Sequence, residues 1–307
     1  MTQASRRCIR SVDSFNPQKV NRIGHDFSDH PLLQAEALRA LAKRLEQGQT
    51  EKVKFIDPNA EAGSDFILGT RPPPGRSIDD LFDNLSAPGS WLAIYEARTD
   101  PEYGPLIDEV IAAGAPLLGA ESRTIFDSDA YIFISAPPSL TPFHIDRENN
   151  FFLQIRGRKQ FSAWDPNDRE TVPESAVEGW IVRGSLAGVK WRDDHVRRAV
   201  VHEELGPGQG LFMPSTSAHM SRTRTRSESE SGEPGLVSIS IGVVYYTAHT
   251  KRHAVIYALN SLLRKLKWKP QPPGHCSRSV ESIKYASGWV ATRLLERMGR
   301  FYRQRGM

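Results

Sequence analysis

The chain has 307 residues, of which 39% are hydrophobic and 25% charged, an ordinary composition for a globular protein in water. Residues 1–20 hold no signal-peptide pattern and no stretch is apolar for long enough to cross a bilayer, so we expect a cytoplasmic protein without a membrane partner. The two cysteines, Cys8 and Cys276, are too few and too far apart for a disulfide framework or a cysteine-based zinc site.

The net charge of +4 is unevenly distributed along the chain. Residues 251–307 hold 13 Lys and Arg against two Glu, a charge of +11, so the remaining 250 residues carry −7. A basic end of this kind suits an anionic partner such as nucleic acid, although a solvated helix face explains it equally simply. The acidic remainder argues against nucleic acid as a substrate.

The pattern of apolar residues divides the chain into three regions. Residues 1–85 are expected to be partly helical, with a helix over 32–48 and a loop at 71–77. Residues 86–250 are expected to form the core, in which the segment 101–116 offers a short helix that stops at Gly114. Residues 251–307 are expected to form a basic helical segment.

Within the core, the period of the apolar residues changes to two from about residue 123. Short β-rich runs separated by Gly, Pro and polar turns predict a mainly β fold with flanking helices, an antiparallel sandwich or jelly roll. The polar stretches 167–204 and 221–235 are candidate lids, and the second is expected to be a mobile loop between two strands.

The C-terminal segment carries an apolar stripe at helical spacing. Its members are Ile283, Ala286, Val290, Leu294, Met298 and Phe301. A stripe of this kind packs on its own domain in most proteins. A homodimer formed through the C-terminal helices is the main alternative.

The runs 151–156 and 159–164 predict a β-hairpin with a two-residue turn at Gly157-Arg158. Alternation then places Asn150, Phe152, Gln154 and Lys159 on one face. Arg156 would lie opposite Lys159, and two opposed cations are unfavourable unless an anion such as a dicarboxylate lies between them.

His144 and Asp146 are two residues apart and would project from the same side of a strand. A third candidate ligand, His219, follows a short apolar strand at 211–213. Two histidines and one carboxylate form the facial triad of non-haem ferrous oxygenases, whereas catalytic zinc sites usually show other spacings. We interpret the other seven histidines as surface or satisfied core residues.

The segments TPFHIDRENNFFLQIRGRKQF (141–161) and GPGQGLFMPSTSAH (206–219) resemble the JmjC and cupin-like superfamily of iron(II) and 2-oxoglutarate dioxygenases. The resemblance covers about a quarter of the chain, and its closest branch contains the asparaginyl hydroxylase known as factor inhibiting HIF. It implies a double-stranded β-helix core and a hydroxylase that uses dioxygen.

By the same resemblance, His144, Asp146 and His219 match the metal ligands of that family. Thr141 and Lys159 match the groups that bind the distal carboxylate of 2-oxoglutarate. Asn150 matches a polar residue near the oxoacid end of the co-substrate, and Phe152 matches a pocket wall.

The sequence also departs from the family pattern. Small residues at 215–218 replace bulky aromatic ones, and Gly242 stands where a polar residue is common. The third 2-oxoglutarate-binding group has no clear match, although Tyr131 is a candidate.

Three functions therefore remain open. The first is a dioxygenase that hydroxylates a protein side chain or a small metabolite, with a sugar or lipid as further substrate classes. The second is a catalytically silent cupin-like regulatory or binding module, including a transcriptional regulator. The third is a cupin isomerase or epimerase with another divalent metal.

Overall fold

The computed structural model describes residues 7–48, 51–55, 60–65, 69, 77–84, 91–223 and 237–297. The predicted loop at 71–77 therefore lies outside the described residues except for Ser77, and the predicted loop at 221–235 does so except for 221–223, which end a strand. Among the helices described, none is both long and apolar enough to span a membrane.

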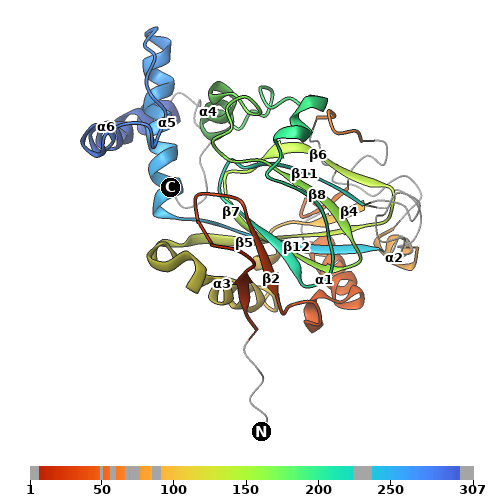
Figure 1. The fold of residues 1–307 in the computed structure, drawn as a ribbon. Coiled ribbons are helices and arrows are strands. Elements are labelled where there is room, and N and C mark those ends of the chain that lie inside the picture. Colours follow the sequence, from red (N-terminus) through yellow and green to blue (C-terminus); the bar gives the residue numbers. More distant parts are fainter. Residues whose placement is uncertain are drawn as a thin grey trace.

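Two antiparallel sheets pack face to face and form the core (Figure 1). The large sheet contains β1 (Ile9–Ser11), β2 (Asn21–His25), β3 (Val53–Phe55), β4 (Trp91–Ile94), β5 (Phe126–Ser135), β7 (Asn149–Arg156), β10 (Gln209–Met213) and β12 (Ser238–Tyr246). The small sheet contains β6 (Ser139–Ile145), β8 (Lys159–Ala163), β9 (Val201–Leu205) and β11 (Ala218–Thr223).

The topology of β5 to β12 is that of a double-stranded β-helix. The large sheet has the order β1-β2-β10-β7-β12-β5-β4-β3, and the small sheet has the order β6-β11-β8-β9. From β5 onward the chain changes sheet at every step except between β8 and β9, which is jelly-roll connectivity. The predicted mainly β fold with a cupin-like core is confirmed by this topology.

The N-terminal region adds strands as well as helices to the molecule. β1 and β2 extend the large sheet beside β10, and β3 pairs with β4 at its other edge. The predicted helix is present as α1 (Ala35–Gly48), and a short helix α2 (Ile78–Asp83) follows it. The domain boundaries at residues 85 and 250 stay predictions.

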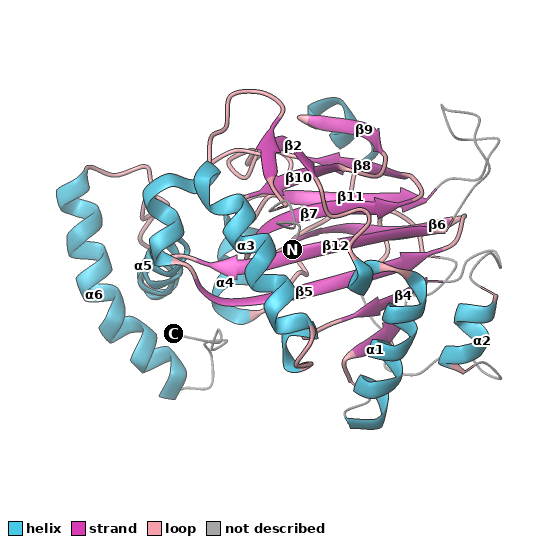
Figure 2. Ribbon diagram, turned by 90° about the horizontal axis from the view of Figure 1, so that it is seen from below, coloured by secondary structure: helices cyan, strands magenta, loops and turns pink. Residues whose placement is uncertain are grey.

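Helices cover the outer face of the large sheet (Figure 2). α1 and α3 (Tyr103–Leu118) contribute buried side chains, including Leu41 and Val110, to one apolar cluster with Phe151 and Ile241 of the sheet. All nine residues of β12 are consequently buried, because one face of this strand contacts helices and the other contacts the small sheet.

α3 continues through Gly114 instead of stopping there, so the predicted end of this helix is wrong. A Cβ atom at Gly114 would lie 2.5 Å from the Phe151 ring. This glycine therefore permits the close approach of α3 to the sheet and does not terminate the helix.

The predicted hairpin at 151–164 is also wrong. β7 belongs to the large sheet, where it pairs with β10 and β12, whereas β8 belongs to the small sheet and pairs with β9 and β11. The turn at Gly157, with φ of 64°, carries the chain from one sheet to the other. Arg156 is exposed and Lys159 is buried, so the two cations do not oppose each other.

The C-terminal segment forms α5 (Ala248–Lys265) and α6 (Arg278–Arg297), which pack together at one end of the core (Figure 1). α6 buries a row of small residues against α5; at Gly288, a Cβ would lie 2.5 Å from the Val255 carbonyl oxygen. Ile283, Val290 and Leu294 of the predicted stripe are instead 66%, 71% and 48% exposed. The interpretation that this stripe packs on its own domain is wrong for these three residues.

Candidate metal centre

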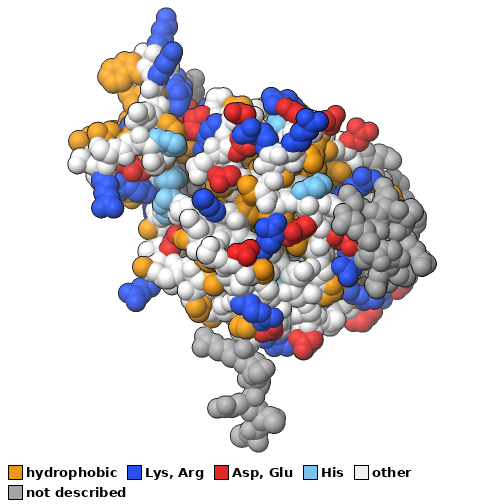
Figure 3. All heavy atoms as spheres, viewed as in Figure 1, with side chains coloured by type: hydrophobic (Ala, Val, Ile, Leu, Met, Phe, Trp, Pro, Cys, Tyr) orange, Lys and Arg blue, Asp and Glu red, His pale blue; other side chains and the backbone are white. Residues whose placement is uncertain are grey.

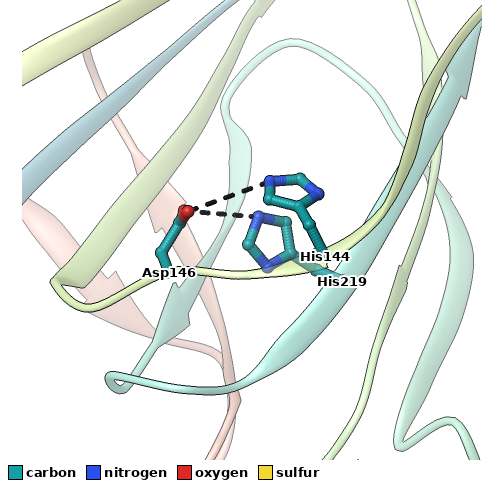
Figure 4. A group of neighbouring side chains, drawn as sticks. All are labelled: His144, Asp146 and His219. Atoms are coloured by element: carbon teal, nitrogen blue, oxygen red, sulfur yellow. Dashed lines mark ion pairs between the residues drawn. The ribbon is translucent and has the colours of Figure 1, made fainter. Parts of the chain in front are cut away.

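The pairing of β6 with β11 brings the three predicted metal ligands together. His144 on β6 lies opposite His219 on β11, and Asp146 follows the end of β6. The Nε2 atom of His219 is 3.5 Å from Asp146 Oδ2, and that of His144 is 3.9 Å from Asp146 Oδ1 (Figure 4). The ligand atoms of all three lie within 4.8 Å of one another, and this is the one group of three or more such residues within the described ranges.

Backbone carbonyls orient both imidazoles. Nδ1 of His144 is 2.7 Å from the Pro142 carbonyl oxygen, and Nδ1 of His219 is 3.0 Å from the Ser217 carbonyl oxygen. When each Nδ1–H donates to its carbonyl, the lone pair of Nε2 faces Asp146, as a metal ligand requires. Burial, together with the neighbouring His219, lowers the pKa of His144 to about 4, so its ring is neutral at neutral pH.

The triad lines a cavity of about 230 Å³ between the two sheets. The four other predicted site residues line the same cavity, Thr141 from β6, Asn150 and Phe152 from β7, and Lys159 from β8. The structure thus brings all seven predicted residues into one space. Their roles stay predictions.

Lys159 is a buried cation without an acidic partner. It is 3% exposed, its Nζ donates to Ser240 Oγ at 3.3 Å, and no ion pair joins it to any carboxylate of the described residues. Its Nζ also lies 5.7 Å from the centre of the Phe133 ring. Burial lowers the pKa of Lys159 to about 7, because removal from water disfavours the ammonium form.

Asn150 also has unused hydrogen-bonding capacity. Its Oδ1 atom is buried and has no partner. A Cβ at Gly242 would lie 2.9 Å from that oxygen, so the glycine of β12 makes room for the Asn150 side chain. The buried ammonium fits an anionic guest, and the unpaired amide oxygen fits a hydrogen-bond donor.

Several residues of the cavity were not predicted from the sequence. Tyr95 from β4 is one of them, and it stacks on Tyr131, the candidate for the third 2-oxoglutarate-binding group, with ring centres 4.4 Å apart; both rings line the cavity. Glu148 accepts a hydrogen bond of 2.6 Å from the Tyr246 hydroxyl. Burial, followed by the charge of Asp146, raises the pKa of the Glu148 carboxyl.

The mouth of the cavity includes Trp180 from α4 (Glu174–Arg183), within the stretch 167–204 that was expected to be a lid. The guanidinium of Arg147 lies 4.1 Å from the centre of the Trp180 ring and donates to the Trp180 carbonyl at 2.6 Å. The Trp180 indole nitrogen is buried without a partner. Whether this stretch moves as a lid stays a prediction.

Two of the other histidine interpretations need comment. His25 is a satisfied core residue, because its Nε2 lies 3.0 Å from the Gln154 carbonyl oxygen. His195 is 1% exposed and neither ring nitrogen has a partner, so the expectation of a satisfied or surface residue is wrong there.

The fold and site together define a double-stranded β-helix protein with a His-Asp-His cluster facing an internal cavity. No protein-family model matches this chain, and no curated protein matches it. Similar solved structures include YcfD, a ribosomal oxygenase from Escherichia coli, with 12% identity over 85% of this chain and 58% of that one and a TM-score of 0.42.

Two further structures are similar at the same level. YcfD in complex with cobalt and 2-oxoglutarate shows 15% identity over 94% of this chain and 63% of that one, with a TM-score of 0.41. The non-heme alpha-ketoglutarate-dependent carbocyclase SnoK, from nogalamycin biosynthesis, shows 16% identity, coverage of 76% and 81%, and a TM-score of 0.45.

This chain spans about three fifths of the length of the YcfD chains it matches. At these identities and TM-scores the likenesses carry no argument about activity, and the fold is assigned from the sheet topology. The structures named here include no asparaginyl hydroxylase, so the placement in that branch stays a prediction.

Proposed function

We propose that this protein is an iron(II)- and 2-oxoglutarate-dependent dioxygenase of the JmjC and cupin-like type. The observation that carries the proposal is the presence, in one cavity, of a two-histidine, one-carboxylate cluster and a buried lysine without an acidic partner. The first suits ferrous iron with open coordination positions, and the second suits the far carboxylate of a dicarboxylic acid.

The donor set fits ferrous iron better than its rivals. Two imidazoles and one carboxylate supply three ligands, and the neighbouring cavity leaves space for further ones. Bound iron would activate dioxygen, and the oxidative decarboxylation of 2-oxoglutarate would supply two of the electrons that reduce it, so that a C–H bond of the substrate can be hydroxylated. An isomerase or epimerase would need neither Lys159 nor a dicarboxylate.

Other residues of the cavity bind and orient 2-oxoglutarate. The Lys159 ammonium and the Thr141 hydroxyl donate to the distal carboxylate, and the Asn150 amide lies toward the oxoacid end. Phe152, which contacts Phe161 with ring centres 4.6 Å apart, supplies an apolar wall that excludes water. The Tyr131 hydroxyl is the candidate for the remaining donor.

The prime substrate is a protein side chain or a small metabolite that undergoes hydroxylation. It would enter past Trp180, Glu148 and Tyr95, which line the cavity beside Asp146. These groups combine two aromatic surfaces with a carboxylate, so we expect the reacting group to be carried on a polar molecule.

The test is succinate production from 2-oxoglutarate by the full chain with ferrous iron and ascorbate in air. We expect turnover in the wild type and none in Asp146→Ala, with unchanged turnover in Asp127→Ala as a matched control on β5, outside the cavity. Turnover that persists in Asp146→Ala would overturn the assignment. Absence of both turnover and 2-oxoglutarate binding in the metal-loaded wild type would favour the silent binding module.

A further inference from the structure

A second, smaller cavity of about 60 Å³ lies beside the candidate metal centre. Its walls include the start of α5 and residues 214–216, which join β10 to β11. Asn149 lines this cavity and Asn150 lines the larger one, because neighbouring residues of a strand point to opposite faces. The two cavities are therefore separated by the first residues of β7 and by this connecting segment.

Two histidines face this cavity from one side of α5. His249 and His253 are four residues apart, so their side chains lie on the same face of the helix. Their ring centres are 4.1 Å apart at an interplanar angle of 52°. The corresponding values for His144 and His219 are 4.2 Å and 53°.

Both imidazoles are available as ligands. Neither ring has a hydrogen bond to any residue that the structure describes.

The surrounding charges permit a cation. Arg169 lines the cavity, but its Nε donates to Glu174 at 2.5 Å and its Nη1 to the Pro166 carbonyl at 2.5 Å, so its charge is already compensated. The Nε atom of Arg252, the residue before His253, lies 3.9 Å from Glu281 Oε1. The lining includes no carboxylate, and its oxygen donors are hydroxyl and amide groups.

We propose that His249 and His253 form a second metal site, which takes a divalent ion of the zinc class, with water or hydroxyl oxygens of the cavity completing the coordination. Imidazole ligands without carboxylates suit Zn²⁺, Ni²⁺ or Cu²⁺ and disfavour Mg²⁺ and Ca²⁺. The pair lacks a third protein ligand of the usual kind, so the affinity is expected to be lower than that of the triad.

An ion in this position would lie against the segment that separates the two cavities. The backbone N–H of Ser215 donates to Asn149 Oδ1 at 3.0 Å, and that of Thr216 donates to the Asp146 carbonyl at 2.8 Å. Thr216 has a φ of 67°, which is unusual for a threonine. The same short segment therefore supports Asp146 on one side and the proposed ion on the other.

The experiment is a Zn²⁺ titration of the full chain in competition with a chromophoric chelator. The wild type is expected to bind two equivalents, the second more weakly. His249→Ala should lose the weaker equivalent, with at least a tenfold loss of affinity at that site, and His144→Ala should lose the tighter one. His275→Ala, which changes an exposed histidine outside both cavities, should keep both.

His249 is the test position, and circular dichroism checks that its variant is folded. Two equivalents of Zn²⁺ in folded His249→Ala would overturn the proposal. So would a wild type whose single Zn²⁺ equivalent is kept in His249→Ala, or a cavity that responds to inorganic phosphate and not to Zn²⁺. Failure of the triad gives a different result, namely one equivalent in the wild type that His249→Ala loses and His144→Ala keeps.

Discussion

His144 and His219 are direct partners in the antiparallel ladder of β6 and β11, and this register places their ring centres 4.2 Å apart. The ladder is irregular immediately after His219, where the register shifts before Ser221. Two imidazoles on adjacent strands of the small sheet thus point into the cavity, where Lys159 and Asn150 also project. A co-substrate held by Lys159 would therefore lie beside the two imidazoles.

Replacement of Lys159 by Met should affect ligand binding and stability in opposite directions. Loss of a charge-assisted hydrogen bond is expected to weaken 2-oxoglutarate binding by roughly 10- to 100-fold. Removal of a buried cation that has no acidic partner should raise the free energy of unfolding of the unliganded protein by about 1–4 kcal/mol. Calorimetry and urea unfolding measure the two effects, with Ser240→Ala as the control for the Ser240 hydrogen bond. Unimpaired binding in the Met variant would contradict the assigned role.

The pH dependence of 2-oxoglutarate binding follows from the pKa of Lys159, which burial lowers from 10.5 to about 7. A bound carboxylate favours the ammonium form and raises this pKa again, so binding at pH 8 should take up a proton. The affinity should therefore fall as pH rises above about 7, by up to roughly tenfold per pH unit. Calorimetry in two buffers with different ionisation enthalpies measures the uptake, and equal heats in both would refute the prediction.

The stability of the unliganded protein should show the corresponding trend. Between pH 7 and 10.5 the folded Lys159 is largely neutral whereas the unfolded one is charged, so the unfolded state binds more protons and raising the pH favours folding. The stability advantage of Lys159→Met over the wild type is therefore complete below pH 7 and shrinks as the pH approaches 10.5.

Gly114→Ala should destabilise the protein, because the added methyl group would lie 2.5 Å from the Phe151 ring. Overpacking of this kind costs about 1–3 kcal/mol. Gly104→Ala is the matched control in the same helix, since the nearest atom would be the Arg98 carbonyl oxygen at 3.7 Å. That change should be neutral or stabilise by up to about 1 kcal/mol. Equal stabilities of the two variants would show that α3 does not pack on β7 in this way.

The exposed apolar row on α6 leads us to propose that two copies of the chain associate through this helix. The row consists of Val280, Ile283, Val290 and Leu294, at spacings of three, seven and four residues. Apolar residues at this spacing form the contact surface of a helix that packs on another helix. Figure 3 shows hydrophobic side chains over the C-terminal helices.

Light scattering tests this proposal. Val290→Asp should convert a dimer to a monomer, whereas Glu296→Lys, an exposed position on the other side of the same helix, should leave the dimer intact. A wild type that is monomeric at micromolar concentration would rule it out. Point substitutions are preferable to truncation after residue 250, because α5 buries Val255 and Ile256 in the protein.

Much of the fold and site was predictable because it depends on short-range spacing. His144 and Asp146 are two residues apart, and the alternation of a strand is enough to place them together. The helical period of its apolar residues predicted α1, and Leu38, Leu41 and Leu45 of this helix are buried as expected.

The wrong predictions of the hairpin and of the helix end concern the neighbours against which a strand or helix packs in the folded chain. The turn at Gly157 has a local sequence suited to a hairpin, but the flanking strands gain more by pairing with β12 and β11 in opposite sheets. The sequence predicted that the helix ends at Gly114, because it does not show that this residue lies against the Phe151 ring. Tyr95 and Trp180 join the site from β4 and α4, whose contacts with the cavity depend on the tertiary fold alone. The spacing of His249 and His253 was visible in the sequence, but the cavity that they face was not.

The central claim is that one cavity holds a metal ion by the triad and 2-oxoglutarate by Lys159. The measurement that tests it most directly is the calorimetric affinity for 2-oxoglutarate with and without Mn²⁺ under anaerobic conditions, in the wild type and in His219→Ala. The account predicts that Mn²⁺ strengthens binding at least tenfold in the wild type and has no effect in the variant. Binding of equal strength with and without metal in the wild type would contradict it.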